Sequence, residues 1–171
     1  MALQQINKSI LSSPASAIEV TGIDSDNVYM LTIRNLEPVD NAVYPLLRFI
    51  VGGSAVATTD YAYANKNIKS AVSFSNMANS SQTQILLLSE QNGNAGQEKF
   101  NGICYIYNAN DSSEYTNITS ENVALDSNTN ALGSMGGGTL LDASAVEGVS
   151  VLFTSGNVAA GAEMVLYKVL E

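Results

Sequence analysis

The chain has 171 residues, 46% of them hydrophobic, and a formal net charge of −9. That length suits one domain with a proper core, and the acidic surplus opposes nucleic-acid binding, which needs clustered Lys and Arg. No apolar stretch approaches the roughly 20 residues of a membrane span, and the start lacks the basic and apolar segments of a signal peptide. We therefore expect one domain over 1–171, with no nucleic-acid partner and no membrane insertion.

The chain contains one cysteine and no histidine. An intrachain disulfide, a Ser-His-Asp triad and an imidazole metal cluster are therefore ruled out. Cys104 lies in an apolar, strand-like run, which predicts a buried thiol rather than a reactive one. We predict no catalytic, cofactor-binding or metal-binding residues, and hence no enzyme.

Short apolar runs alternate with turns rich in Gly, Asn, Ser and Asp, a pattern typical of β-strands. Residues 1–14 are expected to form an N-terminal arm or an edge strand. In chain order, the predicted strands are Gln5–Leu11, Ser16–Thr21, Val28–Leu36, Leu46–Val51, Ala71–Met77, Gln84–Ser89, Gly102–Asn108, Val149–Thr154 and Met164–Leu170.

About nine strands with regularly spaced turns predict an all-β fold, an antiparallel β-sandwich of the jelly-roll-like kind. Asn108–Gly138 is the least strand-like segment, and we interpret it as a long loop. For Leu140–Val149 one turn of helix remains an alternative. The predicted core residues are Leu31, Ile33, Leu47, Phe49, Leu86, Leu88, Ile106, Leu152 and Val165.

Tyrosine pairs and the long loop are the candidate binding surface. Tyr61 and Tyr63 alternate in an extended segment, so both would point to one side. Tyrosine offers a large contact area with a polar tip, which suits protein and sugar interfaces. The loop adds Asp111, Tyr115 and Asn117 to this predicted surface.

Two acidic segments are compared with calcium-binding loops. Asp126–Asn130 resembles the opening of a calcium loop, but Ala131 stands where the sharp-turn glycine belongs, so a solvated turn is predicted. Asp24 and Asp26 form a second pair with the same interpretation. Paired carboxylates leave glycoside hydrolysis as the one open enzyme class, although the chain has no tryptophan to line a sugar site.

The order of several segments is distinctive. The chain contains Ile18–Ile23, Asn35–Pro38, Asp60–Tyr63 and the turn Asn92–Gly96, and it closes with Phe153-Thr154-Ser155-Gly156-Asn157-Val158-Ala159-Ala160-Gly161, followed by Leu166-Tyr167. This pattern resembles small β-rich virion structural proteins of tailed bacteriophages, marine ones especially, and the C-terminal domains of phage tail-fibre proteins.

The resemblance implies a non-enzymatic virion structural protein that acts by surface binding, as a tail-associated fibre or adhesin-type module. A capsid decoration (cement) protein is the alternative, and a carbohydrate-binding module or a glycosidase ranks behind both. Implied partners are other virion proteins, the chain itself as a homotrimer, and a host surface glycan or receptor. The protein would be made in the host cytoplasm and located in the virion. No fibre shaft or anchor precedes the strands, which favours a stand-alone virion protein.

Overall fold

The computed structural model describes residues 2–170, which form strands and turns without a helix. No membrane-spanning helix is therefore found among them. The strands are β1 (Ala2–Ile10), β2 (Ala17–Thr21), β3 (Tyr29–Leu36), β4 (Pro45–Val51), β5 (Ser54–Ala55), β6 (Tyr61–Lys69), β7 (Ser73–Gln82), β8 (Ile85–Leu86), β9 (Phe100–Tyr107), β10 (Asn117–Leu125), β11 (Ala131–Leu140), β12 (Gly148–Phe153) and β13 (Glu163–Leu170).

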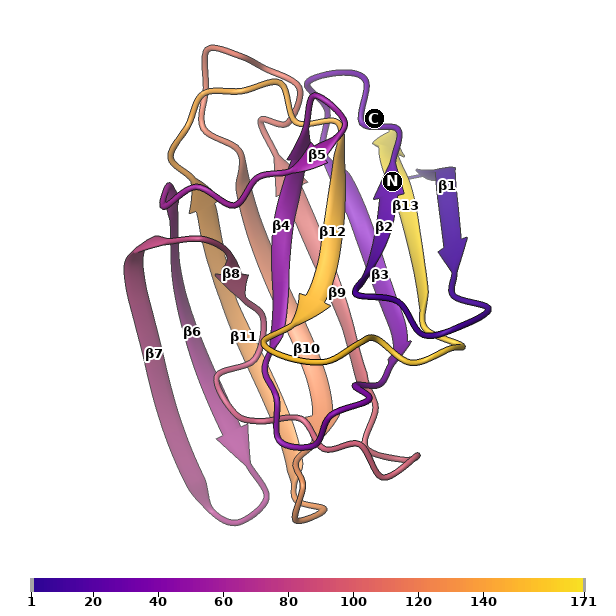
Figure 1. The fold of residues 1–171 in the computed structure, drawn as a ribbon. Coiled ribbons are helices and arrows are strands. Elements are labelled where there is room, and N and C mark those ends of the chain that lie inside the picture. Colours follow the sequence, from indigo (N-terminus) through magenta and orange to yellow (C-terminus); the bar gives the residue numbers. More distant parts are fainter. Residues whose placement is uncertain (1, 171) are drawn as a thin grey trace.

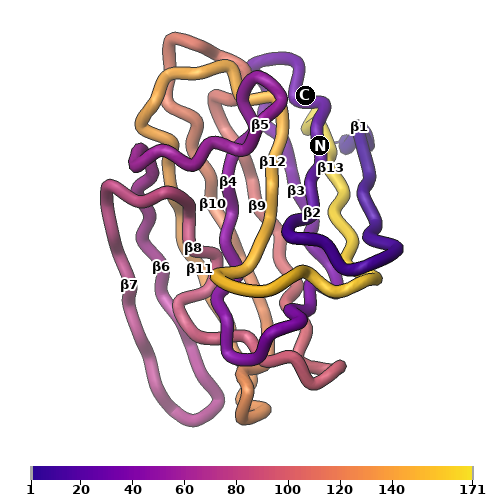
Figure 2. The backbone as a smooth tube through the Cα atoms, viewed as in Figure 1, coloured from indigo at the N-terminus to yellow at the C-terminus, as the bar shows by residue number. Residues whose placement is uncertain are grey.

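The strands build two antiparallel sheets that face each other (Figures 1 and 2). The larger sheet has eight strands in the order β1-β13-β3-β9-β10-β11-β6-β7. The smaller has the order β2-β12-β4-β5, with β8 also paired to β4. The prediction of an all-β antiparallel sandwich is confirmed.

The connectivity is that of a jelly roll with additions. From β2 to β12 the chain crosses repeatedly between the two sheets, and β2, β12, β4 and β8 form one layer. In a jelly roll, one strand lies between the two that correspond to β3 and β6 in the other layer. Here the three-stranded meander β9–β10–β11 takes that place. Strands β1 and β13 extend this layer beyond β3. The meander therefore lies at the centre of the eight-stranded sheet.

The predicted long loop Asn108–Gly138 is the main correction to the sequence analysis. Most of it forms β10 and part of β11, and the missed segment Tyr61–Lys69 forms β6. The sequence pattern does not predict β10 and β11 because small polar residues occupy inward positions that are usually apolar. Examples are Ser120, Asn122 and Ser134. The alternative of a helical turn in Leu140–Val149 is also wrong, because that segment is irregular until β12 begins.

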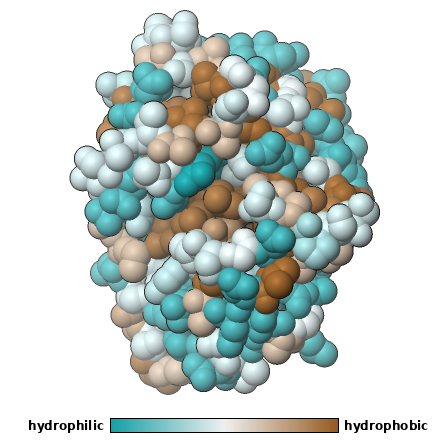
Figure 3. Space-filling model, viewed as in Figure 1, coloured by the Kyte–Doolittle hydropathy of each residue, from teal (hydrophilic) through white to brown (hydrophobic). Residues whose placement is uncertain are grey.

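Six of the nine predicted core residues lie in the hydrophobic core between the sheets: Leu31, Ile33, Leu47, Phe49, Leu88 and Ile106. Leu86 and Val165 are buried but lie outside this core. Leu152 is only half-buried, because β12 directs its neighbours Val151 and Phe153 inward. The prediction for Leu152 was therefore one residue out of phase. On the side seen in Figure 3, hydrophobic surface is broken up by hydrophilic residues.

Asparagine side chains complete the packing where the small sheet is short. The Nδ2 atom of Asn122 donates to the carbonyl of Leu87 at 2.8 Å, and that of Asn65 donates to the carbonyl of Leu86. These bonds fasten the end of β8 and the residue that follows it onto the inner face of the large sheet. The sheet's other face is left uncovered by the second layer.

Candidate functional site

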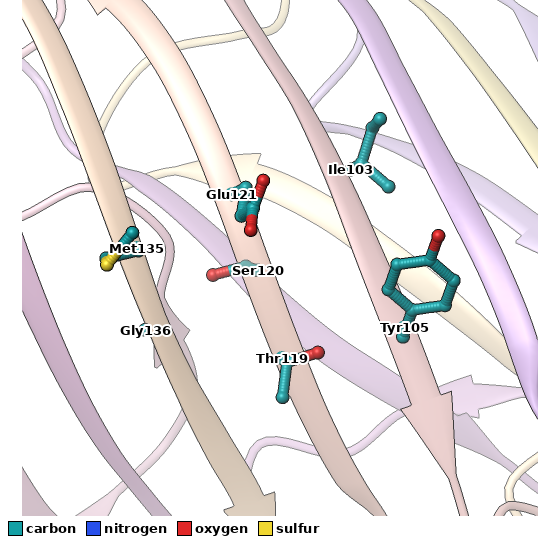
Figure 4. A pocket seen from close by; sticks show the side chains of 7 residues that line it. All are labelled: Ile103, Tyr105, Thr119, Ser120, Glu121, Met135 and Gly136. Atoms are coloured by element: carbon teal, nitrogen blue, oxygen red, sulfur yellow. The ribbon is translucent and has the colours of Figure 1, made fainter.

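The uncovered face of the eight-stranded sheet carries a row of residues in direct cross-strand register. Glu121 on β10 is paired with Met135 on β11 and with Ile103 on β9. Figure 4 shows its side chain between those two. The row continues to Lys66 beyond Met135 and to Thr32 beyond Ile103. Residues from five strands are thus brought together by pairing alone.

A hollow of about 510 Å³ is centred on this row, with Glu121, Ile103, Met135, Tyr105 and Thr119 at its wall (Figure 4). Two further hollows, of about 560 and 230 Å³, adjoin it, and Glu121 lines all three. Together they form one trough along the face. We call this feature the Glu121 trough.

The trough exists because β11 alternates glycine with larger residues on this face. Gly133 and Gly137 point outward on either side of Met135, so the sheet surface drops on both sides of that residue. A Cβ atom at Gly133 would meet nothing within 4 Å, which confirms that the space above it is open. Glycine is otherwise unfavourable inside a strand, so its use here points to a need for close approach to the backbone.

Apolar side chains around the trough are unusually exposed. Ile103, Met135, Val123 and Ile68 are between 45% and 55% exposed, although all lie on regular strands. A contiguous exposed apolar surface rimmed by polar groups is typical of an interaction site. Tyr105 contributes an aromatic ring to the same surface.

Among residues 2–170, Glu121 is the only one with a carboxylate that lines the three hollows. Within residues 2–170 its side chain makes no hydrogen bond or ion pair with the protein. Its carboxylate oxygens are therefore free to accept hydrogen bonds from a ligand, with the Thr119 hydroxyl two residues away on the same face. An apolar shelf beside a free acceptor suits the apolar face and hydroxyl donors of a neutral sugar.

Tyr61 and Tyr63 point to one side of β6, as predicted, but that side is the inner face of the large sheet. Tyr61 is 0% exposed and lies in the core, so its inclusion in that surface is wrong. It points inward because β6 alternates, and its hydroxyl bonds to the backbone of β4. Tyr63 is half-buried on the same inner side and packs against the core.

The other predicted binding residues lie at one end of the sandwich. Tyr115 is 50% exposed, and Asp111 caps its own loop by accepting hydrogen bonds from Ser113. Asn117 is exposed on β10 and stands on the same face as Thr119, two residues along the strand. This loop therefore borders the Glu121 trough without lining it.

In each suggested calcium segment one carboxylate, that of Asp126 or of Asp24, is engaged by the protein. Asp126 lies 2.6 Å from the Lys69 ammonium and accepts backbone hydrogen bonds from Asn128 and Asn130. Desolvation raises the pKa of Asp126, but the bonds from Lys69 and Asn130 outweigh it and hold the pKa well below its ordinary value. Asp24 accepts the Tyr29 hydroxyl at 3.0 Å and lies 3.6 Å from Lys168.

Within residues 2–170, no three acidic, histidine or cysteine side chains are grouped as metal ligands would be. Cys104 is fully buried on β9, as predicted. Burial raises the pKa of its thiol to about 12, so the thiolate is not formed near neutral pH.

Sequence reasoning missed the trough because its residues come from segments far apart in the chain. One signal was present: Val123, Glu121 and Thr119 alternate with smaller residues in a stretch flanked by turns. Such alternation is typical of a strand. Gly133 and Gly136–Gly138 belong to the predicted long loop Asn108–Gly138 and instead lie within β11.

Comparison with known proteins adds little. No family model and no curated protein matches the chain. A search of solved structures gives the GH43 protein BlXynB from Bacillus licheniformis, as a mutant, with 9% identity and a TM-score of 0.31. The match covers 90% of this chain and 33% of that protein. A likeness at this level does not establish a shared fold.

Proposed function

We propose that this chain is a non-enzymatic virion structural protein of a tailed bacteriophage, acting as a tail-associated fibre or adhesin-type module. Its contact surface is the Glu121 trough, and its ligand is a neutral sugar of a host surface glycan. The observation that carries the binding role is the register that places Ile103, Glu121 and Met135 side by side on a face the second sheet leaves open.

Three features support this proposal. The jelly roll is an architecture that viral capsid proteins and lectins share. The chain closes with the Phe153–Gly161 and Leu166-Tyr167 pattern that resembles phage virion proteins. The trough combines an aromatic ring, apolar side chains and one unengaged carboxylate, which is a recognition surface.

The trough favours binding over glycoside hydrolysis. Hydrolysis with two carboxylates requires them about 5–10 Å apart across the scissile bond. Glu121 is the only carboxylate lining the three hollows, so the described residues do not offer a second one there. A lone carboxylate accepts hydrogen bonds from a sugar without cleaving it.

The virion role is tested by quantifying the protein in purified phage particles and finding its position in a virion map. A few tens of copies or fewer on the tail would support the proposal. Hundreds of copies on the capsid would replace the adhesin role with that of a decoration protein. Absence from washed particles would contradict both roles.

A further inference from the structure

Strand β7 is covered on neither of its faces. Eight of its ten residues are exposed, and the other two, Ser75 and Gln82, are half-buried. Figures 1 and 2 show β7 as the outermost strand beside β6, with no strand of the small sheet lying over it. A long strand that buries so little adds little stability to an isolated domain.

The outer edge of β7 is free and well formed. Among residues 2–170 its only strand partner is β6, and the register with β6 is regular from Ser73 to Asn79. Its backbone N–H and C=O groups on the other edge are therefore available to another strand. Free edges usually carry charged residues or proline against such pairing, and β7 has neither.

The opposite edge of the same sheet is protected by contrast. A bulge interrupts β1 in its middle, between Gln5 and Asn7, whereas the register shift of β7 against β6 lies at the end of that strand, between Asn79 and Gln82. Lys8 adds a charge to this strand, and the Asn7 amide donates to the carbonyl of Thr21 on β2. Strand β1 is thus held against the second layer, whereas β7 is not.

Apolar side chains accompany the free edge. Phe74 on β7 is 69% exposed and is paired with Ile68 on β6, which is 49% exposed. Val72, in the turn before β7, is 89% exposed. This apolar group adjoins the backbone edge, so one partner could cover both.

We propose that β7 pairs antiparallel with β7 of a second copy of this chain, around a two-fold axis. A second copy is inferred as the partner because β7 carries no charged residue over its ten residues. Each copy has a net charge of −9 and repels another, but along β7 no like charges would face each other across the axis, so the repulsion is weak there. The edge is also self-complementary, as a two-fold interface requires. The protected β1 edge keeps the assembly from growing further.

Such pairing joins the two eight-stranded sheets into one continuous sheet. The two Glu121 troughs then lie on the same side of it, so a dimer could hold two sugars of one surface at once. The pairing itself does not depend on the virion role or on sugar binding. It gives a dimer, in contrast to the homotrimer implied by the resemblance.

The first test is the native mass from sedimentation, measured over a range of protein concentrations. We expect twice the chain mass for the wild type and about a tenfold or greater weakening for Asn76→Lys, because like charges then approach across the axis. Gln4→Lys is the matched control: it adds the same charge to the exposed edge strand β1 and should leave the dimer intact. A monomeric wild type, a trimer, or equal weakening by both variants would overturn the proposal.

The second test maps the axis by cross-linking. Single cysteines at Ser75, Asn76 and Met77 are introduced into the wild-type chain, where buried Cys104 does not compete. In a two-fold antiparallel pair only residues at the axis face their own copies, so disulfide-linked dimer should peak at one position and fall at its neighbours. Gln4→Cys should give none. Efficient linkage through Gln4→Cys, or none along β7, would contradict the pairing.

Discussion

The hydroxyl of Tyr61 accepts the backbone N–H of Phe49 at 2.9 Å, so one side chain joins β6 of the large sheet to β4 of the small one. The same hydroxyl donates to the carbonyl of Val56 at 3.2 Å. The aromatic rings of Tyr61 and Phe49 stack with their centroids 6.2 Å apart. Burial raises the pKa of Tyr61 to about 12. This tyrosine is therefore a structural residue of the core.

Replacing that hydroxyl should be costly. Tyr61→Phe keeps the ring but leaves the buried N–H of Phe49 without its partner, which should lower the free energy of unfolding by about 1–3 kcal/mol. Tyr63→Phe is the control, since within residues 2–170 the Tyr63 hydroxyl makes only a long hydrogen bond, to the Met77 sulfur at 4.0 Å. Urea unfolding of both variants measures the difference. Equal losses of stability in the two variants would show that the hydrogen bond between Tyr61 and Phe49 does not stabilise the protein more than the Tyr63 hydroxyl does.

Two glycines of β11, Gly136 on the inner face and Gly133 on the outer face, should differ in their tolerance of a side chain. A Cβ at Gly136 would collide with the Asn65 amide, while one at Gly133 would meet nothing within 4 Å. We expect Gly136→Ala to destabilise the protein by about 1–3 kcal/mol through overpacking, and Gly133→Ala to be neutral or stabilising by up to about 1 kcal/mol. Thermal and urea unfolding would decide, and loss of stability in Gly133→Ala would contradict the open trough.

Two side-chain truncations test which residues of β4 and β12 point into the core. Phe49→Ala removes a fully buried ring and should cost about 3–5 kcal/mol. Leu152→Ala should cost less than about 2 kcal/mol, because Leu152 is half-buried on the outer side of β12. Denaturant midpoints at constant m-value provide the measurement. A larger loss for Leu152→Ala would mean that β12 faces the other way.

The Asp126–Lys69 ion pair should make the free energy of unfolding depend on pH in the acid range. Because the pKa of Asp126 is lowered in the folded protein, its contribution is complete above the unfolded pKa of about 4 and is lost as pH falls toward the folded value. Asp126→Asn should therefore reduce stability at neutral pH by about 1–3 kcal/mol and flatten the decline below about pH 4.

Urea unfolding of both proteins across that pH range tests this expectation. A variant whose stability declines with acid as steeply as the wild type would show that Asp126 is not the group responsible. Added calcium should leave the wild-type melting temperature unchanged, because Lys69 and the turn already occupy the carboxylate.

Where hydrophobic alternation is explicit, the sequence predicts the strands well. Val28–Leu36 and Leu46–Val51 are close to β3 and β4, and the all-β sandwich follows from such runs. Strands β10 and β11 could not be found in this way. Several of their inward positions hold the buried polar residues Ser120, Asn122 and Ser134, which interrupt the apolar pattern.

The binding face depends on information that the local sequence does not carry. Ile103, Glu121 and Met135 become neighbours only through the registers of β9, β10 and β11. The predicted residue Asn117 came within two positions of Thr119 because it lies on the same strand face. Tyr61 was misplaced because alternation shows that two side chains share a face without showing which face is buried.

Titration of purified host surface glycan with the wild type, Gly133→Trp and Tyr115→Ala examines the proposed ligand directly. An indole at position 133 would occupy open space beside Met135, whereas Tyr115 belongs to the bordering loop. We expect saturable binding that Gly133→Trp abolishes and Tyr115→Ala leaves nearly intact. Undiminished binding by Gly133→Trp, or no binding by the folded wild type, would contradict a sugar-binding role for the Glu121 trough.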